Sequence, residues 1–165
     1  MATVSTLAEV KRALLDEIQN LAIASATAAS PTSVQVEYAR PPIDQLRSEA
    51  VYFGSESRTV ESDDERQRLQ AGRRMRYLTW EFDLVVSTSI LADAEEAEKR
   101  NFVIVAAVES FLADYPQPAD WPTTAVSSGA MSVVLGALEV DQHESPEGFR
   151  TVETTITLMM NERLT

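Results

Sequence analysis

The stretch RYLTWEFDLVVST at residues 76–88 alternates apolar and polar side chains and most constrains the fold. Successive side chains of a strand point to opposite faces, so this alternation predicts one long, half-buried strand. A strand with one wet face suits an antiparallel sheet, because parallel sheets are normally buried on both faces. The predicted buried face carries Leu78, Trp80, Phe82, Leu84 and Val86.

Two segments have the apolar spacing of amphipathic helices. The first is expected over 7–22, where Thr6 and Glu9 have the spacing of a capping box. The second is expected over 93–114, with Asp93 and Glu96 in a similar box and Pro116 just beyond its end. Each helix needs a sheet surface on which to bury its apolar stripe.

Four more strands complete the predicted sheet. They are expected at 33–38, at 49–54 up to Gly54, at 131–140 and at 149–160. The resulting order is α-β-β-β-α-β-β. It predicts an α+β, two-layer fold in which two helices cover one face of a mostly antiparallel sheet. The remaining segments are a mobile loop at about 55–74, a rigid connector at 116–122 and a turn-rich loop at 141–148.

Length and composition narrow the class of protein. With 165 residues, the chain is expected to form a single domain over 1–165. It has no cysteine, which excludes disulfides. The uncharged stretches 18–36 and 121–138 each contain proline and many hydroxyl residues, so neither is expected to span a membrane. The N-terminus lacks the apolar run of a signal peptide, and we expect a protein made in the cytoplasm.

The charge is acidic and unevenly distributed. The net charge is −12; residues 1–90 hold 13 acids and 10 bases, and residues 91–165 hold 13 acids and 4 bases. So acidic a surface repels phosphate backbones, which argues against nucleic-acid binding. Solubility through self-repulsion is the simplest interpretation of this charge.

No residue constellation indicates catalysis, and no metal or cofactor site is expected. His143 is the only histidine, and we interpret it as a surface residue. The acids 63–65 lack the spacing and glycine of a calcium loop. An enzyme using Glu81, Asp83 or Glu153 with a metal is an open alternative, but outward charges on a half-exposed strand are far more common.

The layout of the chain resembles the tail terminator proteins of long-tailed bacteriophages, the lambda-type tube-capping family. The resemblance covers nearly all of the sequence. An N-terminal helix and the strand VQVEY are followed by the proline link ARPPID, EAVYFG and a variable polar loop. The strand RYLTWEFDLVV, the helix DAEEAEKRNFVIVAAVESFL and two closing strands complete the order.

The resemblance implies a non-enzymatic structural protein of the virion tail or neck, assembled in the host bacterial cytoplasm. Members of the family form a ring, typically a hexamer, on the completed tail tube. The ring stops tube polymerisation and provides the surface on which the head docks. The implied partners are other copies of the chain, the tail-tube protein and a head-completion protein. Another neck or tail-completion protein, or an acidic protein-binding module, is an alternative.

Assembly into a ring requires two properties of the protein surface. Neighbouring copies need complementary patches, and we expect the arginines of the polar loop to face acids on the next copy. Trp121 is a further interface candidate, although it is also suited to packing under the connector. A lumen through which DNA passes should be acidic or neutral. The interface candidates are Arg66, Arg68, Arg73, Arg74 and Trp121, and the channel-facing acids are expected to be either Glu95 and Glu98 on the second helix or Asp141, Glu144 and Glu147 in the last hairpin.

Overall fold

The computed structural model describes residues 6–21, 23, 34–60, 76–126 and 129–164. The element order is α1 (Leu7–Asn20), β1 (Gln35–Ala39), β2 (Glu49–Val60), β3 (Arg76–Leu91), α2 (Ala94–Asp114), the 3-10 helix η1 (Pro118–Asp120), β4 (Ala130–Glu144) and β5 (Phe149–Leu164). Two helices and five strands form an α+β fold, as predicted. The 3-10 helix, which forms in the connector, is absent from the predicted order.

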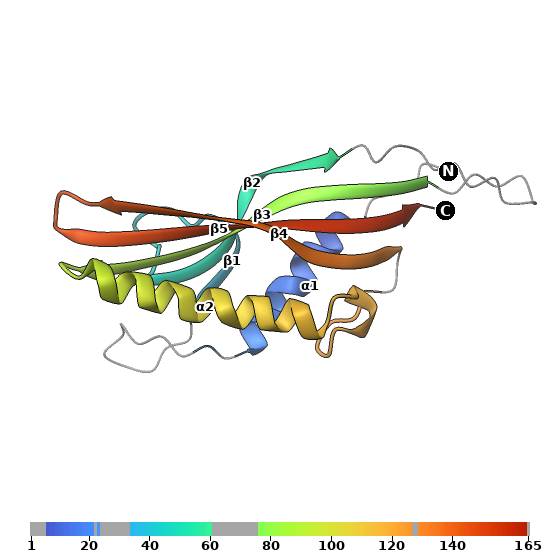
Figure 1. Ribbon diagram of the computed structural model, residues 1–165, viewed down its shortest axis with the longest axis horizontal. Coiled ribbons are helices and arrows are strands. Elements are labelled where there is room, and N and C mark those ends of the chain that lie inside the picture. Colours follow the sequence, from blue (N-terminus) through green and yellow to red (C-terminus); the bar gives the residue numbers. More distant parts are fainter. Residues whose placement is uncertain (1–5, 22, 24–33, 61–75, 127–128, 165) are drawn as a thin grey trace, which may run out of the picture.

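The five strands form one mixed sheet in the order β1-β2-β3-β5-β4. Strands β2 and β3, β3 and β5, and β4 and β5 pair antiparallel, whereas β1 pairs with β2 in parallel. The parallel pair follows from the link 40–48 that carries Pro41 and Pro42. This link returns the chain to the start of β2 rather than turning it back as a hairpin. The sheet lies along the long axis of the molecule, and the β4–β5 hairpin projects at one end (Figure 1).

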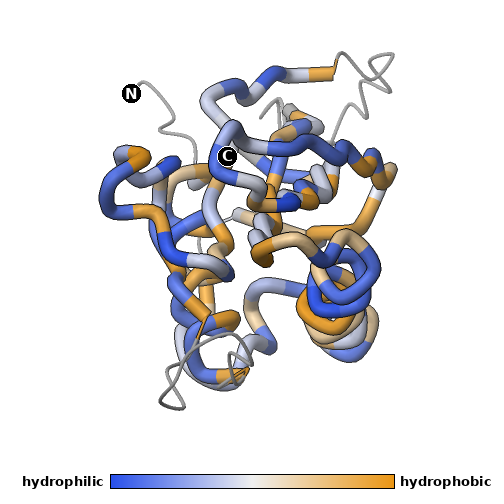
Figure 2. The backbone as a smooth tube through the Cα atoms, turned by 90° about the vertical axis from the view of Figure 1, so that its left-hand side faces the viewer, coloured by the Kyte–Doolittle hydropathy of each residue, from blue (hydrophilic) through white to orange (hydrophobic). Residues whose placement is uncertain are grey.

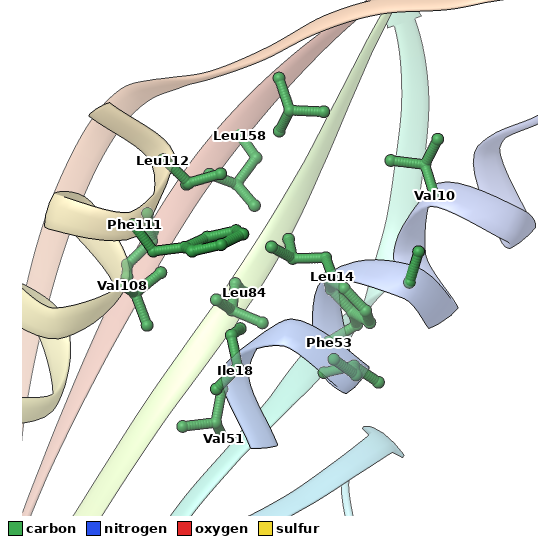
Figure 3. Packing of buried hydrophobic residues seen from close by; sticks show 14 of the residues in the cluster. Val10, Leu14, Ile18, Val51, Phe53, Leu84, Val108, Phe111, Leu112 and Leu158 are labelled. Carbon is green, nitrogen blue, oxygen red and sulfur yellow. The ribbon is translucent and has the colours of Figure 1, made fainter. Parts of the chain in front are cut away.

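Both helices lie on the same side of the sheet, below it in Figure 1. Helix α1 contributes Val10, Leu14 and Ile18 to the core, and α2 contributes Ile104, Val108 and Phe111. Figure 3 shows these two apolar stripes meeting side chains of β2, β3 and β5 between the layers. The buried sheet residues there include Val51, Phe53, Phe82, Leu84, Ile156 and Leu158.

The predicted faces of β3 are correct. Phe82, Leu84 and Val86 are buried, and they lie opposite Leu158, Ile156 and Thr154 of β5. Hydrophobic and hydrophilic residues alternate along the strands (Figure 2). The helices therefore cover the central part of one face of the sheet, and the described part of the chain puts no helix over the other face.

Several strands are longer than predicted. Strand β2 continues through Gly54 to Val60, with a register shift between Phe53 and Ser57. The predicted loop at 55–74 therefore starts too early, and its remainder, 61–74, lies outside the described residues. Strand β4 extends to Glu144, so most of the predicted loop 141–148 is strand. These extensions are polar, and their cross-strand hydrogen bonds, rather than apolar periodicity, hold them in the sheet.

The start of α1 is tied to the far end of the chain. Thr6 makes no side-chain capping bond to its own helix. Its hydroxyl and backbone N–H instead donate to Oε1 of Glu162, at 2.7 and 2.6 Å. The other Glu162 oxygen accepts from Trp80 Nε1 at 2.9 Å. Glu162 is fully buried, so a single carboxylate joins α1, β3 and β5.

Asn101 ties α2 to the sheet in a comparable way. It is fully buried, and its amide donates to the backbone carbonyls of Val86 and Val152 at 2.9 and 3.0 Å. The Thr154 hydroxyl donates to the Asn101 carbonyl. Nearby, Arg100 Nε donates to the buried carboxylate of Glu49 on β2 at 3.0 Å. These contacts set how α2 lies across β3 and β5.

Candidate functional site

The uncovered face of the sheet is the candidate site. Residues that alternate with the core positions of β3 point to this face, and the strand register extends it across β2, β5 and β4. Cross-strand partners place Glu81 opposite Arg58, and Asp141 opposite Glu153. The face carries the acids Glu37, Glu81, Asp83, Glu139, Asp141 and Glu153 and the bases Arg40, Arg58 and Arg163.

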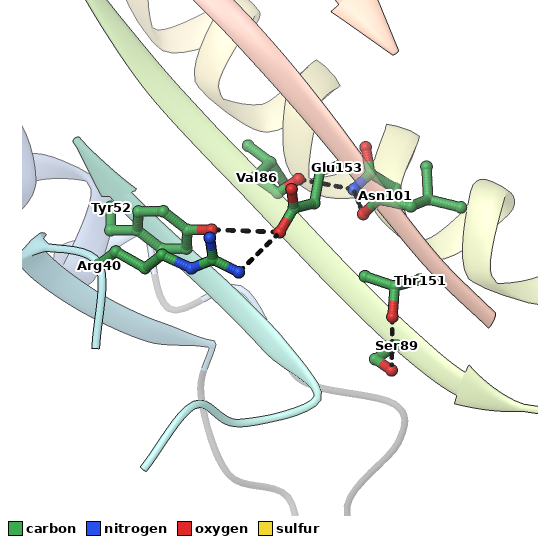
Figure 4. A network of polar contacts seen from close by, with 8 residues as sticks. Arg40, Tyr52, Val86, Ser89, Asn101, Thr151 and Glu153 are labelled. Atoms are coloured by element: carbon green, nitrogen blue, oxygen red, sulfur yellow. Dashed lines mark hydrogen bonds and ion pairs between the residues drawn. The ribbon is translucent and has the colours of Figure 1, made fainter. Parts of the chain in front are cut away.

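Two of these arginines are paired with acids of the same face. Arg58 forms an ion pair with Glu81, although the Arg58 side chain is 73% exposed. Arg40 lies 3.7 Å from Glu153, which also accepts a hydrogen bond from the Tyr52 hydroxyl at 3.3 Å (Figure 4). Exposed pairs of this kind contribute little to stability. Their effect is to neutralise two acids and leave a surface that is acidic overall.

The Tyr52 hydroxyl is held in its protonated form. The residue is only 3% exposed. Burial, followed by the nearby negative charge of Glu153, raises the pKa of Tyr52 to about 12. A phenol at this position therefore donates a hydrogen bond over the whole physiological range and does not act as a base.

Hydroxyl and amide groups fill the space between the charges. The Thr157 hydroxyl donates to Asp83 at 3.0 Å, and Ser89 and Thr151 share a hydrogen bond of 3.0 Å (Figure 4 shows the latter). Toward the other end, Asn161 bonds both Thr79 and Ser132. The surface is thus an array of acids and hydroxyls on strands held by their backbone ladders.

This face contains a polar depression of about 240 Å³. It is lined by Glu56, Arg58, Glu81, Phe82, Asp83, Glu139 and Thr157. Its lining is mainly charged, with four acids and one arginine. Across the described segments, no group of three or more His, Cys, Asp or Glu residues has the arrangement of a metal site.

The structure separates the predicted channel-facing acids. Glu95 and Glu98 lie on α2, on the helix side of the sheet, and Glu95 pairs with Lys99 at 2.6 Å. Asp141 lies on the open face. Glu144 pairs with Arg150 at 2.7 Å, and Glu147 lies in the turn after β4. The helix acids and the hairpin acids therefore lie on different elements, and which of them lines a channel stays a prediction.

The predicted interface residues have different outcomes. Arg66, Arg68, Arg73 and Arg74 lie outside the described residues. Trp121 is 2% exposed, packs against Phe111 and donates from Nε1 to the Tyr115 carbonyl at 2.9 Å. Its burial corrects the interface assignment and supports the alternative, packing under the connector. His143 is exposed near the end of β4, as expected of a surface histidine.

Sequence reasoning missed Glu139 and Arg58 as members of the site. The sequence pattern predicts a loop at Arg58, because the apolar alternation of β2 ends at Gly54. Glu139 appears in the sequence as one acid in an otherwise apolar strand, and only the pairing with β5 puts it beside Thr155. The alternation of β3, continued through its neighbours, is the signal that locates the face.

Comparisons with known proteins give no family assignment. No protein-family model matches the sequence, and no curated protein matches it. A solved structure described as the virion of a native gene transfer agent particle contains a chain with a TM-score of 0.48 and 16% identity. The match covers 92% of this chain and 93% of that one. Neither helix in the described segments is long and apolar enough to cross a bilayer.

Proposed function

We propose that this protein is a structural, non-enzymatic virion assembly protein that caps the end of a phage tail tube as a ring. The ring stops tube polymerisation and provides the docking surface for the head and neck. The proposal rests on the resemblance of the element order to tail terminators and on one structural observation. That observation is the uncovered, acidic and rigid face of the sheet.

This face suits a channel through which DNA passes without binding. Fixed negative charge repels phosphates, whereas arginine or lysine side chains in excess would retain the duplex. Its two arginines nearest the acids, Arg40 and Arg58, are already paired, with Glu153 and Glu81. We therefore assign the channel surface to Glu81, Asp83, Glu139, Asp141 and Glu153, and not to Glu95 and Glu98 on α2.

The alternative of solubility alone makes a different prediction. It requires only that acids be spread over the outer surface, and it assigns no role to the open face. Replacing Glu81 and Asp83, on the central strand β3, by lysine tests the difference. In a channel protein, the double lysine variant should form rings that bind duplex DNA in low salt and should impair genome passage. A matched variant with two α2 acids replaced, Glu95 and Glu98, should not.

Capping is tested directly with the tail-tube protein of the same virion. Tubes polymerised without this protein should be long and heterogeneous, and tubes polymerised with it should be stopped and bear a ring at one end. Electron microscopy of negatively stained tubes gives both readouts. Unchanged tube lengths and bare ends would reject the capping function, and then another neck or completion role, or an acidic protein-binding module, is the better account.

A further inference from the structure

The sheet has two opposite edges at which the described strands lack a partner. In the described part of the chain, β4 pairs only with β5, and the outer half of β2, residues 55–60, pairs only with β3. Short β1 flanks β2 only at Ala50–Phe53. We propose that these edges join: β4 of one copy adds to residues 55–60 of the next copy, and the sheet continues around the ring. This inference rests on the ring of the proposed function and names its subunit interface.

Strand direction favours this junction. Neighbouring strands in the order β2-β3-β5-β4 are all antiparallel. Strands β2 and β5 therefore run in one direction, and β3 and β4 run in the opposite direction. When copies follow one another around a ring, β4 of one copy therefore meets β2 of the next in antiparallel orientation. That is the more stable pairing. The two edges differ, as a head-to-tail interface requires.

The β4 edge has two register shifts, between Ala130 and Ser132 and between Leu135 and Ala137, but from Ala137 to Glu144 its register is unbroken and it lacks the usual protection against pairing. Its residues 130–144 contain no proline, lysine or arginine, which are the residues that normally guard an exposed edge. Leu138 and Val140 point to the helix side of the sheet, as their partners Ile156 and Thr154 do, yet they are 44% and 40% exposed. A long edge with exposed apolar residues is a site for another chain.

Helix α2 leaves this apolar strip open. Arg100 reaches across to Glu49 on β2. Phe102 follows Arg100 by two residues, which is a rotation of roughly 200° about the helix axis. It therefore faces β4. It is 40% exposed and lies at the level of Thr154 and Val140, since the preceding residue, Asn101, bonds Thr154. A strand added to β4 would cover this strip and extend the core across the junction.

The charges of the two edges are complementary. Strand β4 carries Glu139, Asp141 and Glu144 without a lysine or arginine. The opposite edge of the sheet presents Arg40 and Arg58, whose side chains are 61% and 73% exposed, and residues 55–60 contain a single acid, Glu56. Their exposure allows each guanidinium to contact a carboxylate of the neighbouring copy while it keeps its own partner, and such bonds fix which copies pair.

Cysteine cross-linking tests the junction, because the chain has no natural cysteine. Arg58→Cys is combined, one at a time, with Cys at the outward β4 positions Ser132, Val134, Ala137, Glu139 and Asp141. Three strand spacings, roughly 14 Å, separate the two edges in one copy. A disulfide needs Cα atoms within about 7 Å, so any bond formed must join two copies.

We expect a ladder of disulfide-linked multimers from at least one pair under mild oxidation, and little from each single variant. Dimers from a single β4 variant would overturn the proposal, because they show β4 pairing with itself. The absence of a ladder from all five pairs would also overturn it. Arg58→Cys with Val103→Cys, on the exposed side of α2, is the matched negative control.

A blocking variant gives an independent readout. Val140→Lys puts an inward-pointing charge on the β4 edge, which opposes strand addition. Light scattering should show that Val140→Lys needs at least a tenfold higher protein concentration than the parent to assemble into rings. Val103→Lys should assemble at the same concentration as the parent. Equal assembly of both variants would contradict the junction. Tube capping is scored separately in the cysteine cross-linking samples: a ladder without capping rejects the proposed function, and capping without a ladder rejects only the junction.

Discussion

Replacing Glu162 by glutamine is expected to destabilise the protein by about 2–4 kcal/mol. The carboxylate accepts from Thr6 through Oε1 and from Trp80 through Oε2, in a fully buried position. Glutamine has one acceptor oxygen, so its amide must face one of these donors. Losing a bond to a charged acceptor costs about 1.5–3 kcal/mol. Removing negative charge from the start of α1 costs roughly 0.3–1 kcal/mol more.

The assay is thermal and urea unfolding followed by circular dichroism. For a chain of this size, 1 kcal/mol corresponds to a change of about 2–4 °C in melting temperature, so a loss of 3 kcal/mol predicts a fall of about 6–12 °C. Glu147→Gln, in the turn after β4, is the matched control and should stay within about 0.5 kcal/mol of the parent. In the Glu162→Gln background, Trp80→Phe should cost less than it does alone, because the shared bond is already lost.

A Glu162→Gln variant that melts with its parent would refute this reasoning. It would show that the carboxylate is hydrated, or that α1 is held to the sheet by its apolar stripe alone. Additive effects of Glu162→Gln and Trp80→Phe would likewise show that the two side chains are not coupled.

Three further outcomes follow from the same contacts. Alkaline titration followed by tyrosine absorbance should show Tyr52 ionising near pH 12, above the pH of about 10 at which a free phenol side chain ionises. Because the folded pKa is raised, this contribution to stability is complete below about pH 10 and is lost as the pH rises toward 12, and a Tyr52→Phe variant with an unchanged titration curve would contradict it. Asn101→Ala should lower the free energy of unfolding in urea by about 2–4 kcal/mol, because it leaves two strand carbonyls and the Thr154 hydroxyl without their partner. A decrease of less than about 1 kcal/mol would count against that role. Ala92→Gly should stabilise by up to about 1 kcal/mol, because Ala92 has a φ of 59°, and a lower melting temperature would show that this backbone carries no strain.

The sequence predicts the layers well where burial sets the pattern. The alternation around Phe82 and Leu84 identifies a half-buried strand because each inward side chain must be apolar. The α2 boundaries are nearly right, and Asp93 does cap the helix by accepting from the Glu96 N–H at 2.9 Å. Local spacing is sufficient for such features, since every partner lies within a few residues.

Features that depend on distant partners could not be predicted. The bonds from Thr6 to Glu162 join residues 156 positions apart, and nothing near Thr6 distinguishes that arrangement from an ordinary capping box. The outer half of β2, residues 55–60, has no apolar pattern, because both its faces are exposed there. The open face likewise emerges only once the register brings Glu139 beside the residues of β5 and β3.

The most direct test of the account is electron cryomicroscopy of this protein assembled on tail tubes. We predict a ring at the tube end in which the open face of the sheet, with Glu81, Asp83, Glu139 and Asp141, lines the channel and the helices face outward. A channel lined by α2, or by unpaired arginines, would contradict the proposed function.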